Sequence, residues 1–284
     1  MDVLKFLIPK GKIFESVIEL FHDVGIQIKV NERTYRPVLS MDDLEVKIMK
    51  PQNIPAIIGL GTHDVGFTGL DWVEETKSNV VDIMDLGFDP VRIVAAAPEQ
   101  SSKESLKQRK IVVASEYVEL AHRYLEREQY QYVLLRTHGA TEVFPPDDAD
   151  MIIDNSASGR TLVENHLRII DTIMESSTHF IASPQAMENP EKMDRILEFK
   201  MLFEAVMRAR GRVILEMNVP KDKLEQIVKS LPCMRSPTVS PLFGEEGYAV
   251  KIAVSRLEVP RLVPQLKRLG ATDILEYDLR KVVL

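Results

Sequence analysis

The sequence predicts an α/β protein with a separate C-terminal domain of the ferredoxin-like class. In the first two thirds of the 284 residues, short apolar runs alternate with amphipathic helical patterns, which is typical of α/β architecture. After Gly211 the expected element order changes to βαββαβ, which is the order of the ferredoxin-like split unit. The chain therefore has a larger α/β part followed by a smaller α+β domain.

Apolar runs bounded by turn residues predict the strands of the larger part: Leu4–Pro9, Ile26–Val30, Leu44–Lys50, Asp64–Thr68, Val80–Leu86, Val91–Ala97, Lys110–Ser115, Tyr132–Arg136 and Met151–Asp154. Helices are expected at Lys12–Val24 and Tyr117–Glu128, where apolar residues recur at three- and four-residue spacing. The longest helix is expected from Pro190 to Gly211. It ends in basic residues followed by glycine, and it could link two domains.

The C-terminal domain is expected to consist of strands at Arg212–Asn218, Thr238–Leu242, Tyr248–Ser255 and Asp273–Leu284, with helices at Lys221–Leu231 and Glu258–Leu269. Each helix carries one apolar stripe that can cover a sheet. This pattern supports a small domain with its own core.

Composition excludes several classes of protein. The net charge of -7 argues against a non-specific nucleic-acid binder, which needs a basic surface. The single cysteine, Cys233, cannot form an internal disulfide and fits a reducing compartment. The N-terminal segment lacks the apolar stretch of a signal peptide, and no run approaches the length of a membrane span. We therefore expect a cytoplasmic protein.

The most informative segment follows the apolar run that ends at Asp154. Small residues form a loop up to Ser158, and a helix is expected to start between Gly159 and Thr161. Small residues let the backbone approach a phosphate, and free amides, two hydroxyls and Arg160 supply donors. Asp154 could accept hydrogen bonds from ribose hydroxyls or hold a metal-bound water. On spacing alone, an ordinary turn with a serine N-cap is an equal alternative.

Residues Asp154 to Thr161 resemble the phosphoribosyl-pyrophosphate loop of the ATP phosphoribosyltransferase family. Further blocks resemble that family in the same order along the chain: Pro9–Lys12, Lys50–Pro55, Gly61–Asp71, Leu86–Phe88 and Gly139–Glu142. Ser236–Leu242 resembles a segment of the family's long form. The chain departs from the family at Lys12 and Lys50, which are commonly arginine, and at Ala157, which is acidic or hydroxyl-bearing in several relatives.

The resemblance implies transfer of a phosphoribosyl group from phosphoribosyl pyrophosphate to adenine N1 of ATP, the first step of histidine biosynthesis, with Mg²⁺ as cofactor. It implies candidate catalytic residues and a substrate-binding set, without assigning metal ligands. The catalytic candidates are Lys10, Lys12, Arg33 and Lys50 as cationic partners of the phosphates, Glu142 as a polar anchor, and Asp154 for the ribose hydroxyls. The substrate-binding candidates are Gly69, Asp154, Asn155, Ser156, Ala157, Ser158, Gly159, Arg160 and Thr161.

The family also implies a two-lobed catalytic region of the periplasmic-binding-protein type (type II) and an ACT-like regulatory domain. We expect residues 1–97 plus 178–208 in one lobe, 98–177 in the other, and 209–284 in the regulatory domain. Thr238, Val239 and Ser240 are expected near bound histidine, the feedback inhibitor, within a homo-oligomer of two to six subunits that needs no accessory subunit. The alternatives are a phosphoribosyltransferase for another base and a non-catalytic amino-acid-binding sensor.

Overall fold

The computed structural model describes the chain except for residues 1–2, 30–33, 233, 235 and 245. The protein folds into two compact units. The larger unit contains residues 1–22 and 26–197, and the C-terminal unit contains residues 23–25 and 198–284. The long helix α8 (Pro190–Arg210) contributes residues to both units. The three-part division expected from the sequence stays a prediction.

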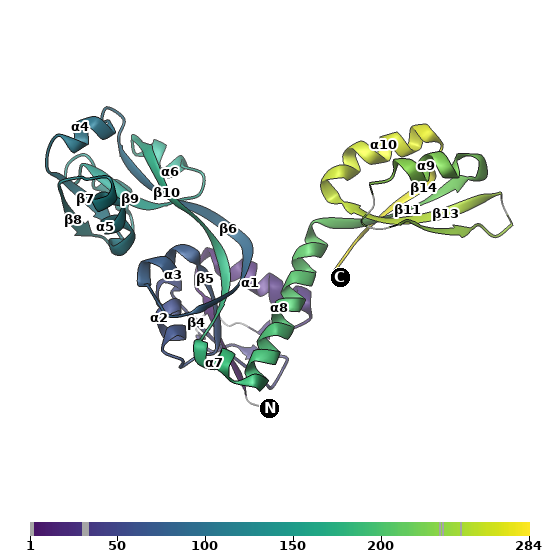
Figure 1. Ribbon diagram of the computed structural model, residues 1–284, viewed down its shortest axis with the longest axis horizontal. Coiled ribbons are helices and arrows are strands. Elements are labelled where there is room, and N and C mark those ends of the chain that lie inside the picture. The colour runs from purple at the N-terminus through teal and green to yellow at the C-terminus, as the bar shows by residue number, and fades with distance from the viewer. Residues whose placement is uncertain (1–2, 30–33, 233, 235, 245) are drawn as a thin grey trace. The chain divides into compact units, whose positions relative to one another are not determined.

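An eight-stranded mixed sheet with the order β4-β1-β5-β10-β6-β9-β7-β8 runs through the larger unit. Its strands are β1 (Leu4–Pro9), β4 (Leu44–Met49), β5 (Val65–Gly69), β6 (Val81–Pro98), β7 (Ile111–Ser115), β8 (Tyr132–Arg136), β9 (Met151–Ser156) and β10 (Leu167–Ala182). Parallel pairs occur among β4, β1 and β5 and again among β9, β7 and β8. The long strands β6 and β10 pair antiparallel between these two groups and join them (Figure 1).

We call the β1-β4-β5 side the first lobe and the β7-β8-β9 side the second lobe. The first lobe carries α1 (Lys12–Val24), η1 (Pro51–Asn53), α2 (Ile54–Gly59), α3 (Leu70–Thr76) and α7 (Pro184–Glu188), and a two-stranded sheet of β2 (Ile28–Lys29) and β3 (Val38–Leu39). The second lobe carries α4 (Lys103–Lys107), α5 (Val118–Arg127), η2 (Thr141–Val143) and α6 (Arg160–Glu164). No helix in the described part of the chain is long and apolar enough to cross a membrane.

The central pair of strands differs from the sequence prediction. Val80–Leu86 and Val91–Ala97 were expected to be two strands, but they belong to the single strand β6, which continues through Gly87 and Asp89 at positive φ. The strand β10 was not predicted. Charged residues such as Asp171 and Glu175 interrupt its apolar pattern, and the strand is defined by its pairing with β6 instead.

The register of this sheet brings the carboxyl ends of β5 and β9 close together. Gly69 at the end of β5 pairs with Thr178 of β10. Ser156 at the end of β9 pairs with Arg92 of β6, which in turn pairs with Glu175. The helix α3, which follows β5 directly, and the loop that follows β9 therefore start near the middle of the β6-β10 ladder. Ligands of open α/β sheets commonly bind at the carboxyl ends of strands, so this is where a site is expected.

The C-terminal unit has the predicted βαββαβ order. Its elements are β11 (Arg212–Pro220), η3 (Lys221–Lys223), α9 (Leu224–Ser230), β12 (Thr238–Pro241), β13 (Gly247–Ser255), η4 (Arg256–Glu258), α10 (Val259–Leu269) and β14 (Thr272–Asp278). The strand order is β12-β13-β11-β14, with antiparallel pairs. The last strand ends at Asp278 and not at Leu284 as expected, because the Val282 amide donates to the Ala205 carbonyl of α8.

A cluster of phenylalanine rings forms the core of the first lobe. The Phe67 ring lies 5.1 Å from Phe180, 5.9 Å from Phe21 and 6.3 Å from Phe6, measured between centroids. All four side chains are fully buried. Offset and edge-to-face contacts of this kind add to the free energy of burying the rings.

Replacing Phe67 by alanine should lower the free energy of unfolding by about 3–5 kcal/mol, since it leaves a cavity among three rings. Urea unfolding can be followed by the fluorescence of Trp72, the single tryptophan of the chain, which lies in the larger unit. Leu60→Ala, at a side chain that is 70% exposed, is the control and should change stability by less than about 0.5 kcal/mol. Equal effects of the two substitutions would contradict this description of the core.

Candidate active site

Two adjoining cavities lie at the middle of the β6-β10 ladder. The smaller one has a volume of about 250 Å³ and is lined from both lobes, by Lys10, Lys12, Gly69, Asp71, Trp72, Glu116, Tyr117 and Asn155 among others. The larger one, of about 540 Å³, is lined by residues that include Arg92, Ala157 and Glu175. Both are bordered by Val91, Ser176 and Ser177. The cavities therefore form one continuous region between the ends of β5 and β9.

Two lysines reach this region from the turn between β1 and α1. Gly11 between them has a φ of 95°, which allows the chain to turn directly from strand to helix. The Lys10 ammonium lies 5.4 Å from the ring centroid of Tyr35, and the Lys12 ammonium lies 3.5 Å from an Asp89 carboxylate oxygen. Both side chains are exposed, so an anionic ligand can reach them at little desolvation cost.

Asp154 lies in the second half of β9, near two other carboxylates. Partial burial raises its pKa to about 6, although hydrogen bonds from the Thr141 hydroxyl and the Asn155 amide oppose the shift. The negative charges of Glu116 and Glu142 raise the pKa further. The Asn155 backbone amide donates to Asp154 Oδ1 at 2.7 Å. Asp154 is thus an acceptor group whose charge is stabilised by a bound cation or a donor ligand.

The loop after β9 exposes backbone donors. Gly159 has a φ of 77° and precedes the first turn of α6. Within the described part of the chain, the amides of Ser158, Gly159 and Thr161 donate to no protein acceptor. Arg160 forms an ion pair with Glu164 at 2.7 Å, but both side chains are exposed, so the pair contributes little and can be exchanged for a ligand.

A hydrogen-bond network connects the lobes beneath the smaller cavity. The Tyr117 hydroxyl donates to Asp71 Oδ2 at 2.7 Å and accepts from Asn155 Nδ2 at 3.1 Å. The Ser176 hydroxyl on β10 donates to Asp71 Oδ1 at 2.6 Å. The Trp72 and Tyr117 rings stack with centroids 4.4 Å apart. Sequence reasoning missed these contacts, because Tyr117 was assigned only to an apolar helix face and no local pattern marks Ser176.

The structure brings Lys10, Lys12, Gly69 and Asn155 to one cavity, and Ala157 to its neighbour. Lys50 precedes η1 and Glu142 lies in η2, and neither lines these two cavities. Arg33 lies outside the described residues. In the C-terminal unit, Thr238, Val239 and Ser240 are exposed on the edge strand β12. The functional roles expected for all these residues stay predictions.

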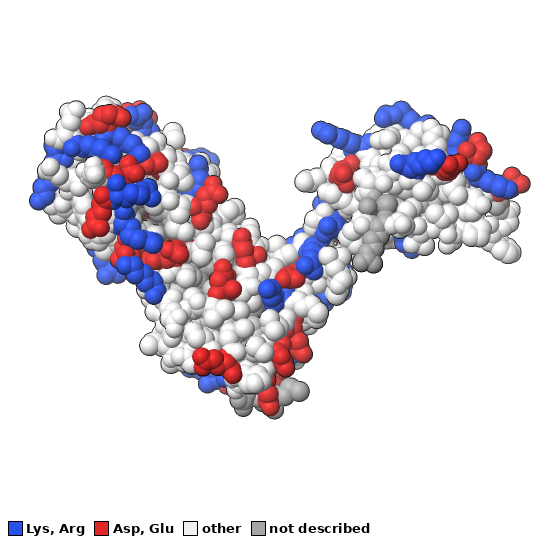
Figure 2. All heavy atoms as spheres, in the orientation of Figure 1, with Lys and Arg blue, Asp and Glu red and all other residues white. Residues whose placement is uncertain are grey.

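No group of three or more histidine, cysteine, aspartate or glutamate side chains is arranged for a metal ion among the residues that the structure describes. Basic and acidic side chains are interspersed over the second lobe on the face shown in Figure 2 and do not gather in a basic patch there.

Comparison with known proteins identifies the family. The family model for ATP phosphoribosyltransferase matches residues 50–201. The ATP phosphoribosyltransferase of Chlorobium chlorochromatii is 39% identical over 287 residues, covering 99% of this chain and 98% of the relative. That of Thermodesulfovibrio yellowstonii is 37% identical with the same coverage. The chain belongs to the ATP phosphoribosyltransferase family.

The model for the C-terminal domain of the same family matches residues 209–281. In a solved ATP phosphoribosyl transferase complex (HisG:HisZ) from Thermotoga maritima, one chain superposes with a TM-score of 0.64 at 26% identity. This match covers 99% of that chain but 71% of the present one. The predicted fold class, a two-lobed α/β region of the periplasmic-binding-protein type with a C-terminal ferredoxin-like domain, is confirmed for this family member.

Gly69 has a structural reason that the sequence does not reveal. A Cβ atom at this position would lie 2.1 Å from Asp71 Oδ1 and 3.5 Å from the Ser176 hydroxyl. Gly69→Ala should displace Asp71 and destabilise the protein by about 1–3 kcal/mol, measured by urea unfolding with circular dichroism. Gly211→Ala is the control, because its Cβ would meet no atom closer than 4.0 Å. An unchanged Gly69→Ala protein would show that Asp71 is not held as described.

Proposed function

We propose that this chain is an ATP phosphoribosyltransferase, which transfers phosphoribosyl from phosphoribosyl pyrophosphate to adenine N1 of ATP in the first step of histidine biosynthesis. Full-length similarity to proteins of that name supports the proposal. The observation that carries it is the segment at the end of β9, where Asn155 lines the same cavity as Lys10 and Lys12, Ala157 lines the adjoining one, and the amides that follow are unpaired. A cytoplasmic location, where ATP is made and used, is part of the proposal.

Different residues bind different groups of the two anionic substrates. The amides and hydroxyls of residues 156–161, with Arg160, bind the 5′-phosphate, and Asp154 accepts hydrogen bonds from the ribose hydroxyls. Lys10 and Lys12 neutralise the pyrophosphate and triphosphate, with Arg33 and Lys50 as further cationic partners and Glu142 as a polar anchor. Gly69 lets the backbone approach the substrate closely.

In the reaction, the N1 lone pair of adenine forms a bond to the anomeric carbon while the bond to pyrophosphate breaks. The transition state resembles an oxocarbenium ion, and the pyrophosphate leaves with the bonding electrons. The protein needs no covalent intermediate. Its contribution is to align two polyanions and to balance their charge.

Mg²⁺ fits the residues around Asp154 in a substrate-bridged form. Burial raises the pKa of Asp154, and the negative charges of Glu116 and Glu142 raise it further, so a cation beside Asp154 would stabilise its charged form. Mg²⁺ commonly binds through one or two carboxylates together with substrate phosphates, so Asp154 is the candidate protein contact. A bound Mg²⁺ would stabilise the negative charge of the departing pyrophosphate.

The direct test is absorbance-monitored formation of phosphoribosyl-ATP by the purified full-length protein, with ATP, phosphoribosyl pyrophosphate and Mg²⁺. Pyrophosphate release with another nucleotide but not with ATP would indicate a phosphoribosyltransferase for a different base. Binding of histidine without any turnover would indicate a non-catalytic sensor. Omission of phosphoribosyl pyrophosphate is the control for substrate-independent absorbance changes.

Histidine inhibition through the C-terminal domain belongs to the same proposal. The matched Thermotoga chain, named as part of a complex with a second protein, corresponds to 71% of the present chain. The additional C-terminal domain supports regulation within this chain, in a homo-oligomer up to a hexamer and without an accessory subunit. Ligand binding between paired domains would shift the quaternary equilibrium.

The pH dependence of kcat/KM should report the ionisation of Asp154. Because its pKa is raised to about 6, the carboxyl is protonated below that pH and loses an acceptor, so kcat/KM for phosphoribosyl pyrophosphate should fall as pH decreases through 6. Asp154→Asn should lower kcat/KM about ten- to hundredfold at pH 8 and flatten this decrease. The substrate's own titration persists in the variant and serves as the internal reference. A profile that is unchanged in shape would exclude Asp154.

Inhibition should depend on the edge strand β12. Thr238→Ala combined with Ser240→Ala should raise the histidine concentration for half-inhibition about tenfold, the effect of losing one or two hydrogen bonds, with unaltered kcat/KM when histidine is absent. Thr272→Ala, at an exposed threonine on β14, is the matched control. Full sensitivity of the double variant would remove these residues from the histidine site.

A further inference from the structure

The Tyr117 hydroxyl lies at a junction between the two lobes. It connects Asp71, in α3 of the first lobe, with Asn155, in β9 of the second lobe, within the segment 154–161 that is proposed to bind phosphoribosyl pyrophosphate. We propose that Tyr117 is a positioning residue for this segment. Its hydroxyl is held by Asp71 and in turn holds the Asn155 side chain, which lies against Asp154. The inference rests on the proposed function, since it concerns how that segment is held.

The direction of the hydrogen bonds supports this role. Ser176 and Tyr117 both donate to Asp71, one to each carboxylate oxygen, and Ser176 also accepts from the Asp71 amide at 3.0 Å. The single hydroxyl hydrogen of Tyr117 is thereby committed, so toward Asn155 the oxygen can only accept. Burial and the charge of Asp71 raise the pKa of Tyr117, which keeps the hydroxyl protonated at all physiological pH values. The Asn155 side chain must therefore present its amino group to Tyr117.

The orientation of Asn155 determines the surroundings of Asp154. Asn155 Nδ2 also lies 3.3 Å from Asp154 Oδ1, and the Asn155 backbone amide donates to the same oxygen. An amide that is free to rotate could turn its carbonyl oxygen toward the carboxylate and repel it. With Tyr117 in place, the Asn155 amino group and backbone amide both face Asp154 Oδ1, so the carboxylate keeps its position.

The ring of Tyr117 is held independently of its hydroxyl. It stacks on Trp72 and is fully buried. The Glu75 carboxylate, from the same helix α3, accepts from the amides of Glu119 and Leu120 at 3.0 Å and so caps the first turn of α5 next to Tyr117. Removing only the hydroxyl therefore leaves the contact between α3 and α5 intact, and Tyr117→Phe isolates the hydrogen bonds.

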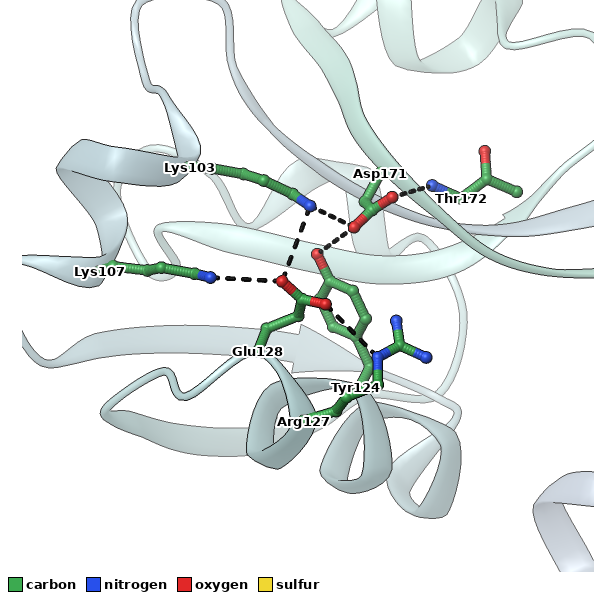
Figure 3. Close-up of polar contacts among 7 residues, drawn as sticks. All are labelled: Lys103, Lys107, Tyr124, Arg127, Glu128, Asp171 and Thr172. Atoms are coloured by element: carbon green, nitrogen blue, oxygen red, sulfur yellow. Dashed lines mark hydrogen bonds and ion pairs between the residues drawn. The ribbon is translucent and has the colours of Figure 1, made fainter.

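A matched control, Tyr124, lies seven residues further along the second lobe. Tyr124 is also fully buried on α5, and its hydroxyl donates to a carboxylate, Asp171 Oδ2, at 3.1 Å. As Figure 3 shows, this carboxylate belongs to a separate charged cluster with Lys103 and Glu128. Tyr124→Phe thus removes a hydroxyl of the same kind without touching the loop or either cavity.

The experiment compares Tyr117→Phe and Tyr124→Phe in steady-state kinetics and in calorimetric binding of phosphoribosyl pyrophosphate with Mg²⁺. Tyr117→Phe should raise KM and Kd for phosphoribosyl pyrophosphate about tenfold and change KM for ATP less than twofold, since the loop contacts only the first substrate. Tyr124→Phe should leave both KM values within twofold of wild type. A purely structural role of Tyr117 would instead lower thermal stability and affect both substrates alike.

Unchanged affinity of Tyr117→Phe for phosphoribosyl pyrophosphate would overturn the inference, as would an equal loss in Tyr124→Phe. Should Tyr117→Phe fail to fold, Asp71→Asn tests the same connection at its other end and should raise the same KM selectively. The binding measurement distinguishes failure of the proposed function from failure of the positioning role. Wild-type protein that binds phosphoribosyl pyrophosphate without forming phosphoribosyl-ATP refutes the proposed function, whereas the affinity of Tyr117→Phe decides the positioning role.

Discussion

The antiparallel pairing of β6 with β10 is the constraint on which the rest of the larger unit depends. Each lobe has its own parallel strands, whose crossover connections keep them within that lobe. The shared ladder from Val81–Ala182 to Pro98–Leu167 joins both sets into one sheet. Because β5 pairs at Thr178 and β9 pairs opposite Glu175, their carboxyl ends converge on the same stretch of the ladder. The location of the site follows from this register.

The positive charge available for anionic substrates comes from a few residues at that location and not from the net charge of the protein. The chain has a net charge of -7, yet the proposed substrates are polyanions. Lys10, Lys12 and the loop amides supply positive potential over a few ångströms, where screening by salt is weak. The carboxylates of Asp154, Glu116 and Glu142 would repel the phosphates, but they suit a cation that is bound to the phosphates.

Helix α3 makes the contact between the lobes specific. Asp71, Trp72 and Glu75 lie on one side of this short helix and engage, respectively, the hydroxyl of Tyr117, its ring, and the amides of the turn that follows it. Gly69 allows the Asp71 carboxylate to fold back toward β10, where Ser176 donates to it. The geometry of the substrate loop is therefore linked to the first lobe through side chains and not only through the connecting strands.

The sequence by itself determined the features that depend on near neighbours. Helical spacing predicted α1 and α5, the apolar runs predicted β1, β7 and β8, and the order of elements after Gly211 predicted the C-terminal fold. The loop from Asp154 to Thr161 and the family blocks were visible because their residues are contiguous. The tertiary structure alone decided that β10 is a strand, that Tyr117 and Ser176 meet Asp71, and why position 69 is glycine. These features join residues far apart in the chain, so their energies come from pairing and packing that no local pattern records.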